Sequence, residues 1–191
     1  MKRHINVLDL CQQGTRALGP GLRYVIWTQG CNRHCPGCTS PEGISLKPKH
    51  LLDIDILAKD IVSRTEIQGI TISGGEPFLQ ANALSALIEQ VWEKRPELTT
   101  LCFTGFEMKD LVWPDAVSLL SHLDVLIDGP YVQELNDNRG LRGSSNQRIY
   151  CLTQRLSPWK DEMESGQRQS EMHVLSNEMV EIGIPSKVSY S

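Results

Sequence analysis

At residues 28–38 the chain reads TQGCNRHCPGC, and this stretch directly follows an apolar run. It carries three cysteines, Cys31, Cys35 and Cys38, in the spacing Cys-x3-Cys-x2-Cys. A 4Fe–4S cluster normally takes four cysteine thiolates. Three cysteines this close in sequence therefore predict a cluster in which one iron is left for a ligand other than a nearby cysteine.

Two other uses of these cysteines stay open at this point. A structural zinc ion needs four ligands, usually from two separated pairs, so its fourth ligand would have to come from elsewhere. The available side chains are those of His34, His50, Cys11, Cys102 and Cys151. Structural disulfides fit less well, because the chain is long for a disulfide-stapled mini-protein and residues 1–9 do not read as a secretion signal. We expect Cys11, Cys102 and Cys151 to be small buried side chains and not ligands.

Length and composition point to one globular domain. The chain has 191 residues, and its hydrophobic content of 40% is too high for a disordered chain. Its net charge of −4 gives no support for a nucleic-acid partner or an anionic membrane surface. No apolar run approaches the roughly 20 residues that span a bilayer. We expect a protein of the reducing cytoplasm, without a membrane or nucleic-acid partner.

Short apolar runs alternate along the chain with segments whose apolar residues recur at helical spacing. Strands are expected at 22–27, 69–73, 98–104 and 123–127, and helices at 54–61, 84–91 and 115–122. Asp53 is the expected N-cap of the first helix. This alternation is typical of right-handed βαβ crossovers and a mostly parallel sheet. We predict an α/β fold, a partial (β/α) barrel, because the chain is too short for the full barrel of about 250 residues.

The C-terminal part differs in character. We predict a partial-barrel domain at 1–154 and an appended segment at 155–191. Residues 148–152 alternate and predict a further strand, whereas residues 155–171 are hydrophilic and predict a mobile loop. Residues 172–175 and 179–184 flank Ser176-Asn177-Glu178 and predict a terminal hairpin.

Polar or glycine-bearing residues follow each predicted parallel strand. The carboxyl ends of such strands meet at one edge of the sheet, where ligands bind. Besides the cysteine loop, the candidate residues are Ser73, Gly74, Gly75, Glu76, Thr104 and Asp128. For any one loop, ordinary turn chemistry explains glycine or aspartate equally well.

The pairing of the cysteine loop with Gly74-Gly75-Glu76-Pro77 is more specific. Two consecutive glycines permit unusual backbone conformations and remove side chains that would block a ligand. Strand-edge carbonyl groups and the Glu76 carboxylate can then bind an ammonium group. The segment predicts a site for a ligand that carries an amine.

The ordered set of motifs resembles the radical S-adenosylmethionine (SAM) superfamily. Within it the chain is most similar to the glycyl-radical enzyme activating enzymes, and among these to the activating proteins of anaerobic ribonucleotide reductase. Besides the cysteine loop and the diglycine segment, the matching segments are Gly19-Pro20-Gly21-x-Arg23, Phe103-Thr104-Gly105-Phe106, Asp124 to Gly129 and Leu141 to Gln147. The resemblance covers roughly residues 5–152.

The resemblance implies roles for these residues. Cys31, Cys35 and Cys38 would hold a 4Fe–4S cluster, whose fourth iron is chelated by the amine and carboxylate of SAM. The implied SAM-binding residues are Gly37, Thr39, Ser73, Gly74, Gly75, Glu76, Thr104 and Asp128. Gly37 and Thr39 flank Cys38 where many members carry an aromatic residue that can contact adenine. Arg23 and Arg142 are candidate partners of the SAM carboxylate.

The resemblance also implies a reaction. The reduced cluster would split SAM into methionine and a 5′-deoxyadenosyl radical, which abstracts hydrogen from a glycine of a partner enzyme such as anaerobic ribonucleotide reductase. The cofactors carry this chemistry, so no separate catalytic side chain is expected. A flavodoxin-like or ferredoxin-like protein would donate the electron. Two alternatives remain: a radical SAM enzyme that modifies a peptide or small molecule, and an iron–sulfur electron carrier or structural metal-binding module.

Overall fold

A seven-stranded sheet forms the centre of the computed structural model, which describes residues 3–175 and 178–186. The strands are β1 (His4–Thr15), β2 (Arg23–Thr28), β3 (His50–Asp53), β4 (Gly69–Gly74), β5 (Thr99–Phe103), β6 (Val125–Asp128) and β7 (Arg148–Cys151). Their order across the sheet is β3-β1-β2-β4-β5-β6-β7. The four inner strands β2, β4, β5 and β6 run parallel, and β1, β3 and β7 pair antiparallel.

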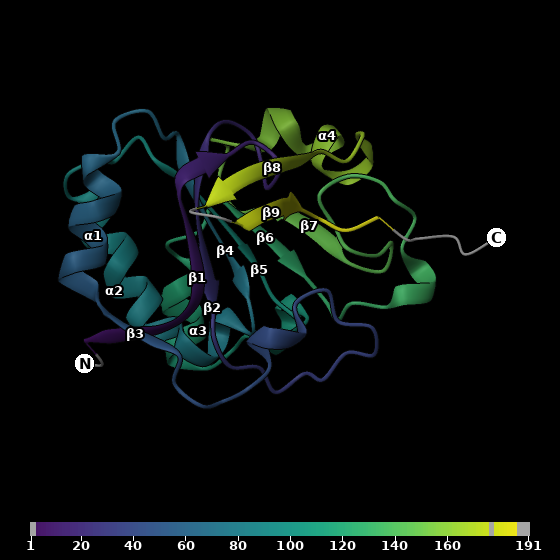
Figure 1. Ribbon diagram of the computed structural model, residues 1–191, viewed down its shortest axis with the longest axis horizontal. Helices are drawn as coiled ribbons and strands as arrows, with labels where there is room; N and C mark the ends of the chain where they lie inside the picture. The colour runs from purple at the N-terminus through teal and green to yellow at the C-terminus, as the bar shows by residue number, and fades with distance from the viewer. Residues whose placement is uncertain (1–2, 176–177, 187–191) are drawn as a thin grey trace.

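Three helices cover one face of this sheet (Figure 1). They are α1 (Ile54–Ser63), α2 (Ala81–Trp92) and α3 (Pro114–Leu120). Successive side chains of a strand point to opposite faces, so Tyr24 and Ile26 of β2 pack in the core beneath the helices, whereas Val25 faces the other side. The predicted α/β class and the mostly parallel sheet are confirmed.

The start of α1 follows its sequence signal. Asp53 Oδ1 accepts hydrogen bonds from the amides of Asp55 (2.9 Å) and Ile56 (3.4 Å), as an N-cap does. Leu57 and Ile61 of the predicted stripe are buried against the sheet. The predicted cap and helix are therefore confirmed.

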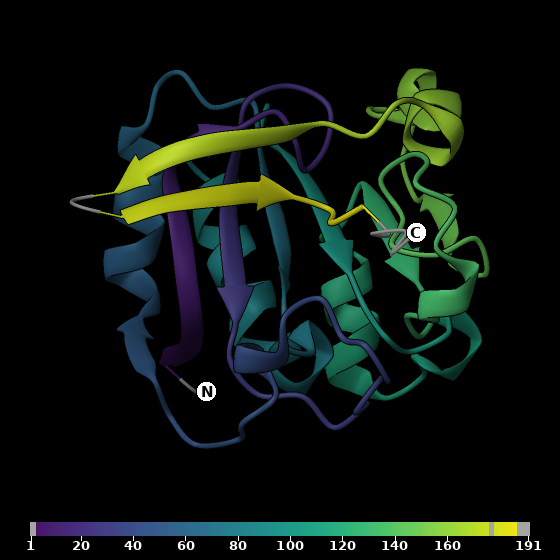
Figure 2. The same cartoon turned by 45° about the vertical axis from the view of Figure 1, so that its right-hand side comes forward.

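The opposite face of the sheet is crossed by a hairpin of β8 (Ser170–Leu175) and β9 (Glu178–Gly183), as Figure 2 shows. Ile182 of β9 is buried in a cluster with Cys11, Leu18 and Val25. The predicted C-terminal hairpin is confirmed, although residues 176–177 of its turn lie outside the described residues.

The prediction of a mobile loop at 155–171 is wrong. This segment contains the short helical turn η5 (Ser157–Trp159) and α4 (Lys160–Ser165). Leu156 and Met163 project from it into a cluster with Leu141 and Ile149, and both are at most 5% exposed. Two apolar anchors thus fix a segment that is otherwise polar.

Two further features refine the expected architecture. The first strand, β1, for which no element was predicted from the sequence, is 12 residues long and lies between β2 and β3 in the sheet. In the described part of the chain β3 and β7 end the sheet without pairing with each other, so a partial barrel stays a prediction, as does the domain division at residue 154. Within residues 3–175 and 178–186, none of the helices combines the length and the apolar character that a membrane crossing requires.

Besides η5, four single-turn helices lie in the loops of the described chain. They are η1 (Pro41–Gly43), η2 (Pro77–Gln80), η3 (Met108–Asp110) and η4 (Gln133–Leu135). Of these, η1 and η2 flank the predicted cofactor loops and position them.

Candidate functional site

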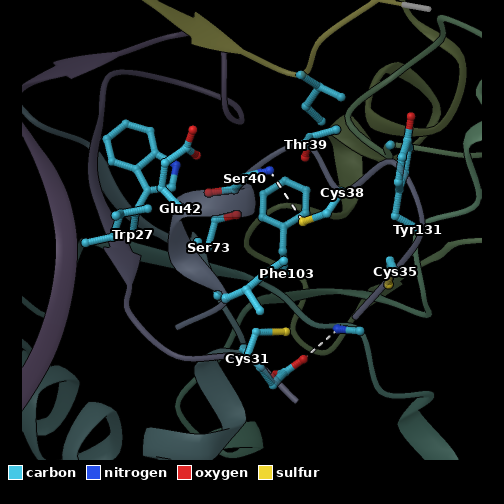
Figure 3. A pocket seen from close by; sticks show the side chains of 18 of the residues that line it. Trp27, Cys31, Cys35, Cys38, Thr39, Ser40, Glu42, Ser73, Phe103 and Tyr131 are labelled. Atoms are coloured by element: carbon cyan, nitrogen blue, oxygen red, sulfur yellow. Dashed lines mark hydrogen bonds between the residues drawn. The ribbon is translucent and has the colours of Figure 1, made fainter. Parts of the chain in front are cut away.

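A cavity of about 700 Å³ lies where the parallel strands end. Cys31, Cys35 and Cys38 line it together with the loop that follows β4 (Figure 3). The lining also includes Ser73, Gly74, Gly75, Glu76, Thr104, Gly105 and Thr39. The structure therefore brings the cysteine loop and most of the predicted SAM-binding residues into one site.

The three cysteines are free, half-buried thiols. Burial raises the pKa of the Cys31 thiol. The amide of Arg33 donates to Cys31 Sγ (3.4 Å), and the amide of Ser40 donates to Cys38 Sγ (3.5 Å). The loop thus already presents main-chain donors to two of its sulfurs.

This donor set fits an iron–sulfur cluster by its chemistry. Among the described residues, no three histidine, cysteine or acidic side chains are close enough together to hold one metal ion. In a 4Fe–4S cluster each cysteine binds a different iron, so the sulfurs surround the cluster instead of meeting at one ion. Three separate thiols along one cavity match that requirement.

The diglycine segment packs directly on the start of the cysteine loop. The Gly75 amide donates to Thr28 O (2.7 Å), and the Glu76 amide donates to Gly30 O (2.8 Å). Gly74 has φ +102°, and a Cβ on it would lie 2.4 Å from Thr28 N. A Cβ on Gly75 would lie 2.4 Å from Gly30 O. Both positions therefore require glycine, because only a bare backbone allows the two loops to approach this closely.

The far side of the cysteine loop is fixed in the same way. The Gly30 amide donates to Gly43 O (2.8 Å), and the Cys31 amide donates to Ile44 O (3.1 Å). Gln29 adds side-chain bonds to Glu42 O (3.2 Å) and Ser45 O (2.6 Å). The first cysteine is consequently held between the η1 region and the diglycine segment.

Glu76 links two strand ends. Its side chain is 1% exposed, and Oε1 accepts from Thr104 Oγ1 (2.8 Å) and the Phe78 amide (3.0 Å), while Oε2 accepts from the Gly105 amide (2.8 Å). Burial raises the pKa of this carboxyl group, and these hydrogen bonds and the nearby Arg33 oppose the rise. Two residues predicted separately as SAM ligands are thus bonded to each other.

Arg33 is a cavity residue that the sequence did not single out. Its guanidinium lies over the ring of Phe106, with Cζ 4.6 Å from the ring centroid. The sequence feature that could have indicated a cation here was Phe106, the second aromatic residue of the Phe103-Thr104-Gly105-Phe106 segment, because a guanidinium group can stack on its ring. Tyr131 also lines the cavity without having been predicted, and so does Gln147 of the matching segment Leu141 to Gln147.

Two predicted SAM-binding residues lie outside the cavity lining. Asp128 is buried, and its Oδ2 accepts from the Met108 amide (2.6 Å), so it supports the loop after β5. Gly37 has φ +69° and packs near Gln133. Its neighbour Thr39 does line the cavity.

The two candidate partners of the SAM carboxylate are also elsewhere. Arg23 is fully buried at the start of β2, where it donates to Pro20 O (3.0 Å) and Thr71 Oγ1 (2.7 Å). Burial lowers its pKa to about 10. Arg142 pairs with Asp137 at 3.1 Å. Neither side chain lines the cavity, so the expectation for both is wrong in this structure.

Of the three remaining cysteines, Cys11 and Cys102 are buried as expected, whereas Cys151 is only partly so. Burial raises the pKa of each of these thiols. They lie away from the cavity and serve packing.

Comparison with known proteins gives a consistent result. Residues 17–150 match the family described as a 4Fe-4S single cluster domain. An anaerobic ribonucleoside-triphosphate reductase-activating protein of bacteriophage T4 is 31% identical over 146 residues, which cover 74% of this chain and 90% of the relative. The protein of that name from Vibrio cholerae is 34% identical over 143 residues, covering 71% of this chain and 91% of its own. The one from Escherichia coli K12 is 30% identical over 141 residues, covering 70% and 91%.

The matched region contains the cysteine loop, the diglycine segment and the Thr104-Gly105 strand end that together line the cavity. By its sequence and by this domain, the chain belongs to the family of anaerobic ribonucleoside-triphosphate reductase-activating proteins.

Proposed function

We propose that this protein is a radical SAM enzyme that installs a glycyl radical on anaerobic ribonucleotide reductase. The observation that carries the proposal is the junction of two loops. The cysteine loop and the diglycine segment line the same cavity and are joined by main-chain hydrogen bonds between Gly30 and Glu76 (2.8 Å) and between Thr28 and Gly75 (2.7 Å).

In this proposal Cys31, Cys35 and Cys38 each bind one iron of a 4Fe–4S cluster and leave one iron for SAM. A reduced cluster held there would supply the electron that splits SAM into methionine and a 5′-deoxyadenosyl radical, and that radical would take a hydrogen atom from the partner's glycine. The protein's part is to orient both cofactors and to exclude water.

We assign SAM to the side of the cavity formed by the diglycine segment, because the groups on that side are negatively polarised or charged. The end of β4 offers main-chain oxygens, and the buried Glu76 carboxylate adds negative charge beneath them. A methionyl ammonium group is complementary to both. Ser73 and Thr104 border the same position, and Thr39 borders the third cysteine. Gly37 and Asp128 act indirectly, through the shape of the loops that they hold.

The partner is inferred from the relatives, whose names describe activation of anaerobic ribonucleoside-triphosphate reductase. The cavity of about 700 Å³ is within the size range of pockets that hold small-molecule ligands and cofactors. We further propose a flavodoxin-like or ferredoxin-like electron donor and a location in the reducing cytoplasm.

The test uses protein reconstituted anaerobically with iron and sulfide. With dithionite and SAM, we expect 5′-deoxyadenosine and methionine, and with the cognate anaerobic reductase added, a glycyl-radical signal in electron paramagnetic resonance. Formation of deoxyadenosine without any radical on the reductase would redirect the proposal to another peptide or small-molecule substrate. If the protein holds its cluster but forms no deoxyadenosine, the remaining interpretation is that it is an iron–sulfur electron carrier.

A matched pair of variants separates cluster ligation from general damage. Cys35→Ala should lose the cluster iron and its absorption, because Cys35 lines the cavity. Cys151→Ala removes an equally half-buried thiol outside the cavity and should retain both. Equal iron content in the two variants would contradict the assignment.

A further inference from the structure

The free edge of β9 borders the cavity. β8 and β9 form a two-stranded sheet of their own, and within the described ranges β9 pairs only with β8. Six consecutive residues, Val180 to Pro185, line the cavity. A strand that turned one face to the cavity would contribute only alternate residues, because successive side chains point to opposite faces. β9 and its continuation therefore present an edge, with its main-chain groups, to the cavity.

The hairpin is held in place at its base. Arg168, just before β8, donates to Pro185 O (2.9 Å), to Asn136 Oδ1 (2.9 Å) and to Arg142 O (2.6 Å). It thereby ties both ends of the hairpin to the loop that follows β6. Because Arg168 spans both ends, the position of the β9 edge relative to the cavity is defined.

A second anchor holds the hairpin to the sheet. Glu171 of β8 accepts from Thr15 Oγ1 (2.7 Å) and from the Arg16 amide (2.8 Å). Ile182 of β9 is 3% exposed and packs among residues of β1 and β2. The edge is therefore a fixed surface, and the hairpin lies beyond residues 17–150, which match the cluster-domain family.

The location of the edge suits a polypeptide substrate. Figure 2 shows β9 on the side of the hairpin that is nearer to the cysteine loop, with β8 on the far side. An unpaired strand edge offers alternating amide and carbonyl groups that an extended peptide can pair with. Six residues of strand span about 20 Å, which is enough to align a short segment along the cavity.

We propose that the glycine-bearing segment of the partner reductase binds as an added strand on the free edge of β9. This inference rests on the proposed function and specifies its substrate contact. Main-chain pairing recognises an extended backbone and suits a segment centred on glycine, which has no side chain to grip. Val180 and Ile184, which are only partly buried, supply apolar surface beside it.

Amide hydrogen exchange on the cluster-loaded protein tests this directly. Adding the cognate anaerobic reductase and SAM should slow exchange at alternate amides of β9, those not bonded to β8, by about tenfold or more, as one new hydrogen bond each would give. Unchanged edge amides in a complex that forms the glycyl radical would overturn the inference. Protection without the reductase that grows with protein concentration would instead place a second copy on the edge and also overturn it.

Paired residues of the hairpin supply matched variants. Met172 is opposite Glu181, and His173 is opposite Val180. In an antiparallel ladder one of these pairs has both amides inside the ladder and the other has both outside. The pair that exchanges fast in the free protein is the outward one, and a proline there removes an edge donor without removing a ladder bond.

The proline on the β9 member of that pair should raise KM for the reductase by about tenfold, whereas the proline on the β8 member, on the far edge, should leave KM unchanged. Equal KM values for the two variants, with hairpin exchange intact in both, would contradict the proposal. Should wild-type protein form neither deoxyadenosine nor glycyl radical, the proposed function itself would have failed, and the exchange result on β9 would be judged separately by reductase binding.

Discussion

Thr104 Oγ1 donates a 2.8 Å hydrogen bond to Glu76 Oε1, and this bond joins the ends of two neighbouring parallel strands inside the cavity. Glu76 also accepts from the amides of Phe78 (3.0 Å) and Gly105 (2.8 Å). The carboxylate is therefore a fixed negative group directly below the diglycine bend. Its hydrogen-bond partners keep it in place before any ligand binds.

Thr104→Val should destabilise the protein. The substitution keeps the shape of the side chain but leaves a nearly fully buried carboxylate one donor short, which costs about 1–3 kcal/mol. Chemical denaturation of the apo protein measures this, and the KM for SAM should rise in the loaded enzyme. Thr100→Val is the control, because Thr100 Oγ1 is buried with no hydrogen-bond partner among the described residues. That variant should be neutral or slightly stabilising, and an equal loss in both variants would contradict the role given to the bond.

Gly74→Ala should prevent assembly of the site. The added Cβ would lie 2.4 Å from Thr28 N and the residue would keep φ +102°, so both a clash and backbone strain oppose it. Gly129→Ala separates the two effects, since Gly129 has φ +100° but its nearest atom would be 3.7 Å away. We expect about 1–2 kcal/mol of destabilisation at Gly129 and a larger loss, with reduced iron content after reconstitution, at Gly74. Similar stability of the two variants would refute the close approach of the loops.

The attachment of the hairpin should weaken in acid. Burial on its own would raise the pKa of Glu171, but hydrogen bonds from Thr15, Arg16 and His173 outweigh it and lower that pKa. A carboxyl group with a lowered pKa in the folded state stabilises it fully above the unfolded value of about 4.3, and the stabilisation is lost as the pH falls through the folded pKa. Relative to the intrinsic exchange rate at each pH, the protection of β8 and β9 amides should therefore fall below about pH 4, and Glu171→Gln should remove this pH dependence. An unchanged profile in Glu171→Gln would show that another group is responsible.

The strand–helix alternation and the site loops were accessible from the sequence because they depend on local patterns. The apolar runs of β2, β4, β5 and β6 gave the parallel sheet, and parallel order places the loops after Trp27, Ser73 and Phe103 at one edge. No strand was predicted where β1 lies, because register shifts between Val7 and Asp9 and between Cys11 and Thr15 interrupt its alternation.

Other features depend on tertiary contacts that no local pattern encodes. α4 is anchored by Met163, but the sequence around Met163 is charged and therefore predicts a solvent-exposed loop. Arg23 looks like an available cation, yet its donors are used by backbone and threonine oxygens beneath the sheet. The pairing of Glu76 with Thr104, and the position of β9 beside the cavity, likewise follow only from how the strand ends and the hairpin pack.

The central claim is that three cysteines hold a cluster with one iron free for SAM beside the diglycine bend. The most direct measurement is electron–nuclear double resonance on the reduced, reconstituted protein with SAM labelled by ¹⁵N in its amino group. The account predicts a hyperfine coupling between the cluster spin and that nitrogen, absent in Cys38→Ala. A fully reduced 4Fe–4S signal that is unchanged by saturating SAM and shows no nitrogen coupling would contradict it.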